Sequence, residues 1–229
     1  MASVEPETTS AHDGSPPRSG KNDGQLPAEP RGAASADRAA RLITEVFSPG
    51  LLVAALLAVV VWHVADSLAE ALTWGAIAIG AASLLPVLYI LRGVRRGRWT
   101  DKHVIVHSQR RKPLLIILVS TATGIGALAL AGAPRTLLML IASMVLSLLV
   151  AVPVTLLFGW GVSIHALVAA GSVAALTVLH GWPVAAVGCV VVTAVGWARV
   201  RLKEHSLGQV VFGALVGALA MGVAFPLLA

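Results

Sequence analysis

The sequence predicts an all-α fold, a polytopic membrane bundle of about six to seven transmembrane helices behind a disordered polar N-terminal tail. Of the 229 residues, 57% are hydrophobic and only 12% are charged. Long apolar segments recur from Leu51 to the C-terminus, and a helix of roughly 20 such residues crosses the ~30 Å hydrocarbon layer. Residues 1–42, in contrast, are rich in Pro, Ser, Gly, Ala and Glu and show no hydrophobic period.

The chain therefore divides into a tail, residues 1–42, and a transmembrane helical domain, residues 43–229. The tail cannot bury enough apolar surface to offset the entropy of ordering it, so we expect it to be disordered. Its acidic residues Glu5 and Glu7 precede any apolar run, which is not the pattern of a cleavable signal peptide. The first membrane helix is expected to act as the insertion signal.

Seven segments are apolar enough to be candidate spans. They cover residues 49–69, 72–91, 113–132, 136–158, 163–180, 183–199 and 207–227. Turn residues separate several of them, such as Gly132 with Pro134 and Gly181 with Pro183. Gly213 and Gly217 form a Gly-x-x-x-Gly pair, which permits close packing of the last helix against a neighbour.

A basic loop connects the second and third spans and carries most of the net charge of +6. Such clusters mark the cytoplasmic side of a membrane protein, so we expect the tail and this loop to be cytoplasmic. The charge therefore indicates orientation and contact with anionic headgroups rather than nucleic-acid binding. The loop's basic residues are Arg92, Arg95, Arg96, Arg98, Lys102, Arg110, Arg111 and Lys112.

A second polar segment, residues 199–206, lies between the sixth and seventh spans and contains Arg199 and His205. Counting two crossings from the basic loop reaches His165, and two more reach His205. All three polar segments are therefore expected on one membrane face. Ionisable groups at such positions are costly and usually functional.

Two histidines beside cationic side chains at helix entrances suit phosphoryl transfer. Guanidinium groups bind phosphate oxygens, and helix N-termini add N–H donors. One imidazole can attack phosphorus while the other protonates the leaving oxygen. A metal-dependent mechanism is disfavoured, because Asp66, Glu70, Asp101 and Glu204 do not form the oxygen-rich cluster that two-metal hydrolysis uses. We therefore expect no metal and no cofactor.

The spacing of Arg199, His205 and Gln209 resembles the third signature motif of the type 2 phosphatidic acid phosphatases, or lipid phosphate phosphatases. Ser163 and His165 resemble the second motif of that family. The resemblance covers about residues 160–229. It implies metal-free removal of phosphate from a lipid phosphate or polyprenyl (di)phosphate through a phosphohistidine, with His205 as nucleophile, His165 as general acid and Arg199 as phosphate clamp.

Other motif positions match less closely. The loop residues Lys102, Arg110 and Arg111 approximate the first motif and, with Ser163, are predicted to bind phosphate. Where the third motif has Ser and Asp this chain has Ala198 and Gln209, and Ile164 replaces a Gly of the second motif. Gln209 can orient an imidazole but lacks the charge of Asp.

Two other functions stay open beside the phosphatase. The chain could be a catalytically inactive membrane protein that binds anionic lipid headgroups, or, less favoured, a small transporter. Ser206 with Gln209 also fits a capping box, and Ser163 a simple helix cap. Four other histidines lack partners at matching spacing and are assigned to interface or loop roles: His63, His103, His107 and His180.

We expect the protein in the plasma membrane, with a lipid or isoprenoid phosphate as its partner and no nucleic acid. Charge bias puts the site on the cytoplasmic face, whereas members of the family it resembles commonly act from the outer face. We give the charge bias more weight.

Overall fold

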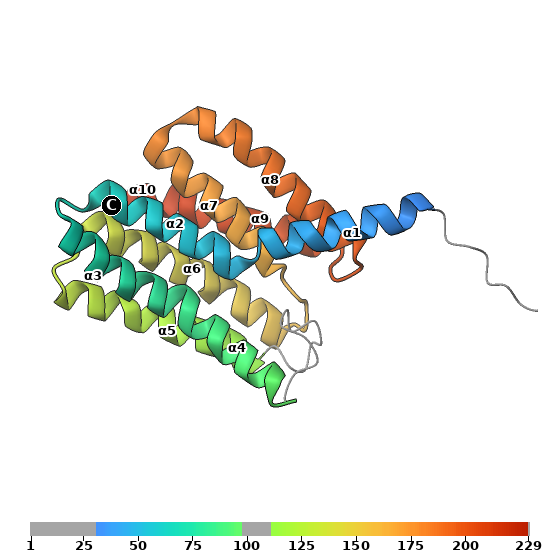
Figure 1. Ribbon diagram of the computed structural model, residues 1–229, viewed down its shortest axis with the longest axis horizontal. Coiled ribbons are helices and arrows are strands. Elements are labelled where there is room, and N and C mark those ends of the chain that lie inside the picture. The colour runs from blue at the N-terminus through green and yellow to red at the C-terminus, as the bar shows by residue number, and fades with distance from the viewer. Residues whose placement is uncertain (1–30, 98–110, 229) are drawn as a thin grey trace, which may run out of the picture.

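The computed structural model describes residues 31–97 and 111–228, and within these ranges the chain is helical with no strand (Figure 1). This confirms the predicted all-α class. The helices are α1 (Arg31–Val46), α2 (Pro49–Val64), α3 (Leu68–Ile79), α4 (Leu85–Arg95), α5 (Arg111–Leu130), α6 (Arg135–Leu157), α7 (Ile164–His180), α8 (Trp182–Arg201), α9 (Leu207–Leu219) and α10 (Phe225–Leu228), with π-turns η1 (Gly80–Leu84) between α3 and α4 and η3 (Ala220–Ala224) between α9 and α10.

A helix lies at each of the seven predicted spans. Five are long and apolar enough to cross a membrane: Leu68–Arg95, α5, α6, α8 and Leu207–Leu228. A sixth candidate is the pair α1–α2, which bends by 43° at residues 47–48. The seventh, α7, has 17 residues, about 26 Å at 1.5 Å per residue. The protein is thus an integral membrane protein.

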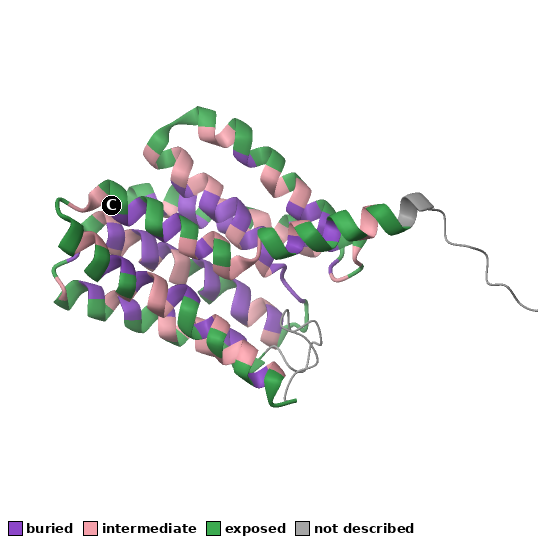
Figure 2. Ribbon diagram, in the orientation of Figure 1, coloured by how far each residue is buried: buried purple, intermediate pink, exposed green. Residues whose placement is uncertain are grey.

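Helix α7 is short because it lies inside the bundle. It packs against α2, α6, α8 and α9, and most of its first turns are buried (Figure 2). A helix surrounded by other helices does not have to match the thickness of the hydrocarbon layer. This short span is therefore the central one, and it carries His165 at its N-terminal end.

Glycines set the close contact between α7 and α9. A Cβ at Gly213 would lie 2.5 Å from the carbonyl oxygen of Ser163, and one at Gly217 would overlap the carbonyl oxygen of Leu167. The Gly-x-x-x-Gly pair thus allows backbone-to-backbone packing, as the sequence predicts. The contact fixes the N-terminus of α7 relative to that of α9.

Helix α1 begins at Arg31, inside the predicted tail of residues 1–42. The segment is rich in alanine, and its residues Ala40 and Thr44 are buried where α1 packs on α8. Asp37 also accepts a hydrogen bond of 2.8 Å from Arg201 of α8. Tertiary packing thus supplies the burial that local composition lacks. The rest of the predicted tail, residues 1–30, lies outside the described residues.

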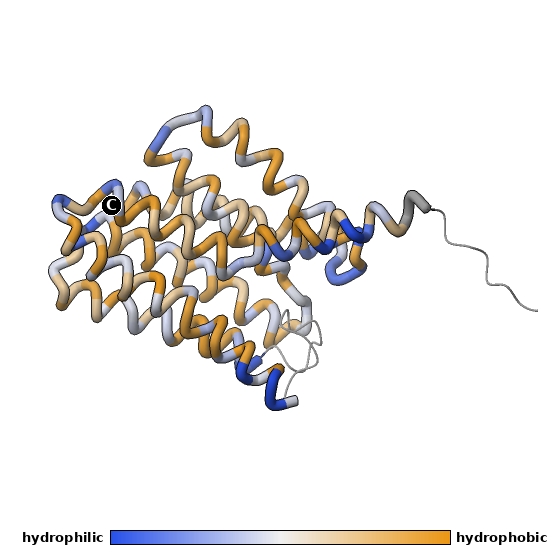
Figure 3. Tube along the Cα trace, in the orientation of Figure 1, coloured by the Kyte–Doolittle hydropathy of each residue, from blue (hydrophilic) through white to orange (hydrophobic). Residues whose placement is uncertain are grey.

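Polar ends of the helices gather at one end of the bundle. The C-terminus of α4, the N-terminus of α5, the α6–α7 linker and the α8–α9 loop lie on the side where α1 projects, and the chain's C-terminus lies on the other (Figure 1). The most hydrophilic described segments are also at this end (Figure 3). The crossing count that put His165 and His205 on one face is therefore confirmed.

Candidate functional site

A Schellman turn at the end of α8 brings Arg199 and His205 together. The N–H of Glu204 donates to the Arg199 carbonyl at 3.1 Å, and the N–H of Lys203 donates to that of Val200 at 3.0 Å, which is the bond pattern of this motif. Lys203 occupies its left-handed position with φ 56°. The His205 N–H also donates to the Arg199 carbonyl, at 3.3 Å. The six-residue spacing thus folds His205 back onto Arg199.

The N-terminus of α7 places His165 beside this turn. Ser163 caps α7 by accepting from the Ala166 N–H, and its own N–H donates to the carbonyl of Gln209 at 3.3 Å. Thr155 of α6 accepts from the Val162 N–H at 3.3 Å. The linker before α7 is therefore tied to both α6 and α9.

His165, Arg199 and His205 all line one cavity of about 310 Å³. Their exposed fractions are 5%, 1% and 9%, respectively, so each is buried although each is polar. The structure thus brings together the three residues predicted to perform the chemistry. They come from two places that are 34 residues apart in the chain.

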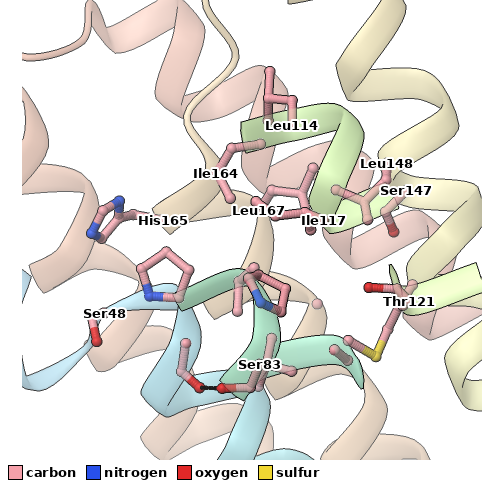
Figure 4. A pocket seen from close by; sticks show the side chains of 18 of the residues that line it. Ser48, Ser83, Leu114, Ile117, Thr121, Ser147, Leu148, Ile164, His165 and Leu167 are labelled. Atoms are coloured by element: carbon pink, nitrogen blue, oxygen red, sulfur yellow. Dashed lines mark hydrogen bonds between the residues drawn. The ribbon is translucent and has the colours of Figure 1, made fainter. Parts of the chain in front are cut away.

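Away from these side chains the cavity is mainly apolar. It runs between α2, η1–α4, α5, α6 and α7. In Figure 4, His165 lies at one end of the labelled side chains and Thr121 and Ser147 lie at the other, with Leu114, Ile117, Ile164 and Leu167 between them. A volume near 300 Å³ is at the small end of ligand pockets. One polar end and an apolar interior match an amphipathic ligand.

Arg199 is the largest side chain that is fully buried in the described part of the chain. Its Nη1 forms an ion pair with the Glu204 carboxylate. Its Nη2 lies 3.5 Å from Nδ1 of His205. Arginine has no acceptor, so Nδ1 is the acceptor in this contact and neutral His205 carries its proton on Nε2.

Gln209 belongs to the cap of α9. Its Oε1 accepts from the Ser206 N–H at 3.0 Å, and the Ser206 hydroxyl accepts from the Gln209 N–H at 3.3 Å. The capping box considered from the sequence is therefore present. The orienting role that the resemblance implies for Gln209 stays a prediction.

The basic loop contributes to the same end of the molecule. Arg111 begins α5 and is exposed, and two residues later Pro113 and then Leu114 line the cavity. Lys102 and Arg110, predicted to bind phosphate, lie outside the described residues. Ser163 is fully buried and serves as the cap of α7.

Two carboxylates near the site were not predicted as site residues. Glu45 of α1 lines the cavity, as does Ser48, and Glu204 pairs with Arg199. The signal for Glu204 was its position beside His205 in a polar segment. Glu45 had no such signal, because α1 is not apolar and its packing on α8 is a long-range contact.

Two histidines assigned to interface roles contact each other at the opposite end of the bundle. The rings of His63, near the end of α2, and His180, the last residue of α7, lie edge to face with centroids 5.2 Å apart. The contact joins the ends of α2 and α7 away from the candidate site, and the interface roles of these two histidines stay a prediction. His103 and His107 lie outside the described residues.

The described residues contain no group of three or more His, Cys, Asp or Glu side chains that could hold a metal ion. Comparisons with protein-family models, curated proteins and solved structures find no match to this chain.

Proposed function

We propose that the protein is a membrane phosphatase that hydrolyses a lipid phosphate or polyprenyl (di)phosphate through a phosphohistidine and without metal. The observation that carries the proposal is the shared cavity of His165, Arg199 and His205, which continues into an apolar interior. A phosphate at the polar end would place the substrate's hydrocarbon chain among the helices. The protein's partners are then its lipid substrate and the membrane.

In the proposed reaction, Nε2 of His205 attacks phosphorus and the bond from phosphorus to the lipid oxygen breaks. His165 protonates the departing oxygen, and in the second step it accepts a proton from the water that cleaves the P–N bond. Attack requires the lone pair of Nε2. When phosphate oxygens accept hydrogen bonds from Arg199, the guanidinium group no longer donates to Nδ1 of His205. The ring proton can then move from Nε2 to Nδ1 through water, which leaves the lone pair of Nε2 available for attack.

Arg199 and Arg201 offer a matched pair for testing the proposal. Arg199 is buried against the cavity, whereas Arg201, two residues later, is exposed and pairs with Asp37. We expect Arg199→Lys to lower phosphate release by about 100-fold, because lysine cannot form two parallel bonds to a phosphate. Arg201→Lys should stay near the wild-type rate.

The measurement is phosphate release from a short-chain phosphatidate and a polyprenyl phosphate, by the full chain in detergent micelles with EDTA present. The proposal fails if neither substrate is hydrolysed by the wild-type chain. It also fails if both arginine variants behave alike.

The proposed location is the plasma membrane, with the site on the cytoplasmic face. The exposed Arg92, Arg95, Arg96 and Arg111 support this orientation, because basic residues accumulate on that side. Labelling of a cysteine placed in the basic loop, in intact cells and in opened cells, tests it. Labelling in intact cells would put the site on the outer face.

The second candidate function is an inactive protein that binds anionic headgroups through the basic end of the bundle. The use of Gln209 in the cap of α9 favours it, since no carboxylate then stands at that position to stabilise an imidazolium. Gln209→Asp separates the two functions. A rise in turnover indicates a weakened enzyme, and no activity before or after the change favours the binder.

A further inference from the structure

Glu204 is placed by the same turn that forms the candidate site. It follows Lys203, the only described non-glycine residue with positive φ, and its N–H donates to the carbonyl of Arg199. A non-glycine residue in this conformation costs about 1 kcal/mol or more and persists where the surroundings require it. The turn therefore fixes the backbone of Glu204 next to Arg199.

The side chains of Glu204 and His205 hold opposite ends of the guanidinium group. Glu204 pairs with Nη1, and Nδ1 of His205 lies 3.5 Å from Nη2. These contacts engage both Nη atoms of the guanidinium group. Arg199 and His205 line the cavity whereas Glu204 does not, so the carboxylate contacts the arginine outside the ligand space.

The ion pair of Arg199 and Glu204 is largely buried, so Glu204 serves as the counter-ion of a buried arginine. The side chains of Arg199 and Glu204 are 2% and 14% exposed, and a buried arginine without a counter-ion is strongly unfavourable. Gln209 cannot supply a negative charge. Glu204 supplies a negative charge next to Arg199, whose guanidinium group contacts His205.

We propose that Glu204 is a positioning residue that holds and neutralises Arg199, so that the guanidinium group stays beside His205 at the cavity. This inference rests on the proposed function, because the held arginine would bind the phosphate group. The Glu204 carboxylate, outside the cavity, thereby supplies the negative charge that the uncharged Gln209 does not.

The test compares Glu204→Gln with Glu204→Asp and with Glu70→Gln in the full chain in detergent micelles. Glu70 is a matched control, since it also makes a local bond, with the Asp66 N–H at 3.0 Å, but at the opposite end of the bundle. We expect Glu204→Gln to lower kcat for a short-chain phosphatidate about 10-fold to 100-fold, as loss of an orienting partner does at other sites. Glu204→Asp should recover part of the rate, and Glu70→Gln should keep it.

A second readout does not depend on turnover: ¹⁵N NMR of labelled histidines follows the protonation of His205. Without the carboxylate, the charge of Arg199 is unbalanced and opposes imidazolium formation, so the midpoint should fall by roughly one pH unit in Glu204→Gln. Glu45 and His165 also face this cavity and are unchanged in all the variants.

The two readouts distinguish the inference from the function on which it rests. A shifted midpoint in a chain that hydrolyses no lipid phosphate supports the positioning of Arg199 and His205 by Glu204 and rejects the phosphatase. An unshifted midpoint overturns the role of Glu204, whatever the turnover. A shifted midpoint with wild-type kcat also overturns it.

Discussion

The two ends of the bundle each hold a pair of histidines, and the pairs differ in burial and in neighbours. His165 and His205 are 5% and 9% exposed and share a cavity with the buried Arg199. His63 and His180 are exposed and contact each other. An imidazole gains chemical significance from a buried cationic partner and a ligand space. The comparison therefore favours the end with Arg199 as the place of the proposed chemistry.

The largest expected difference between the two ends is in turnover. We expect His205→Ala to lower phosphate release by about 1000-fold or more, because a nucleophile has no substitute in the site. His63→Ala, at the other end, should keep the wild-type rate. The measurement is kcat for a short-chain phosphatidate. Equal losses in both variants would remove the distinction between the two ends.

The packing that positions α7 gives the next largest effect. Gly217→Ala places a methyl group against the Leu167 carbonyl oxygen and should destabilise the protein by about 1–3 kcal/mol. Gly126→Ala is the control, since a Cβ there meets nothing within 4 Å. Unfolding in detergent by added denaturant measures both. A Gly217→Ala variant as stable as the control would contradict the close contact of α7 and α9.

Helix caps at the two ends give the smallest effect. Ser206 caps α9 beside the site, and Ser67 caps α3 at the other end. Each change to Ala should cost about 1 kcal/mol of stability. Only Ser206→Ala should also lower turnover, because it loosens the segment that carries His205. Loss of turnover in Ser67→Ala at equal stability would show that the caps do not distinguish the ends.

Much of the fold was predictable because hydropathy and turn residues act locally. Each of the seven apolar segments could be recognised by itself, and the order of crossings then placed His165 and His205 on one face. The contact of Arg199 with His205 also depends on a local turn. Their spacing of six residues was therefore enough to indicate that the two side chains lie close together. These features needed no knowledge of which helices are neighbours.

The parts that escaped prediction depend on packing between distant segments. Helix α1 has little apolar surface of its own and is held by contact with α8, so its composition resembled that of a tail. The cavity is enclosed by residues from five or more helices, and no single segment indicates it. Glu45 and the contact of His63 with His180 arise in the same way.

The central claim is that His165, Arg199 and His205 act on one phosphate in one cavity. The most direct test is to treat the His165→Ala variant with p-nitrophenyl phosphate, whose leaving group needs no protonation, and to locate bound phosphate by mass spectrometry. We predict phosphate on His205, because His165 is absent from the step that releases it. Phosphate on another residue, or no phosphorylated protein in either this variant or the wild type, would contradict the claim.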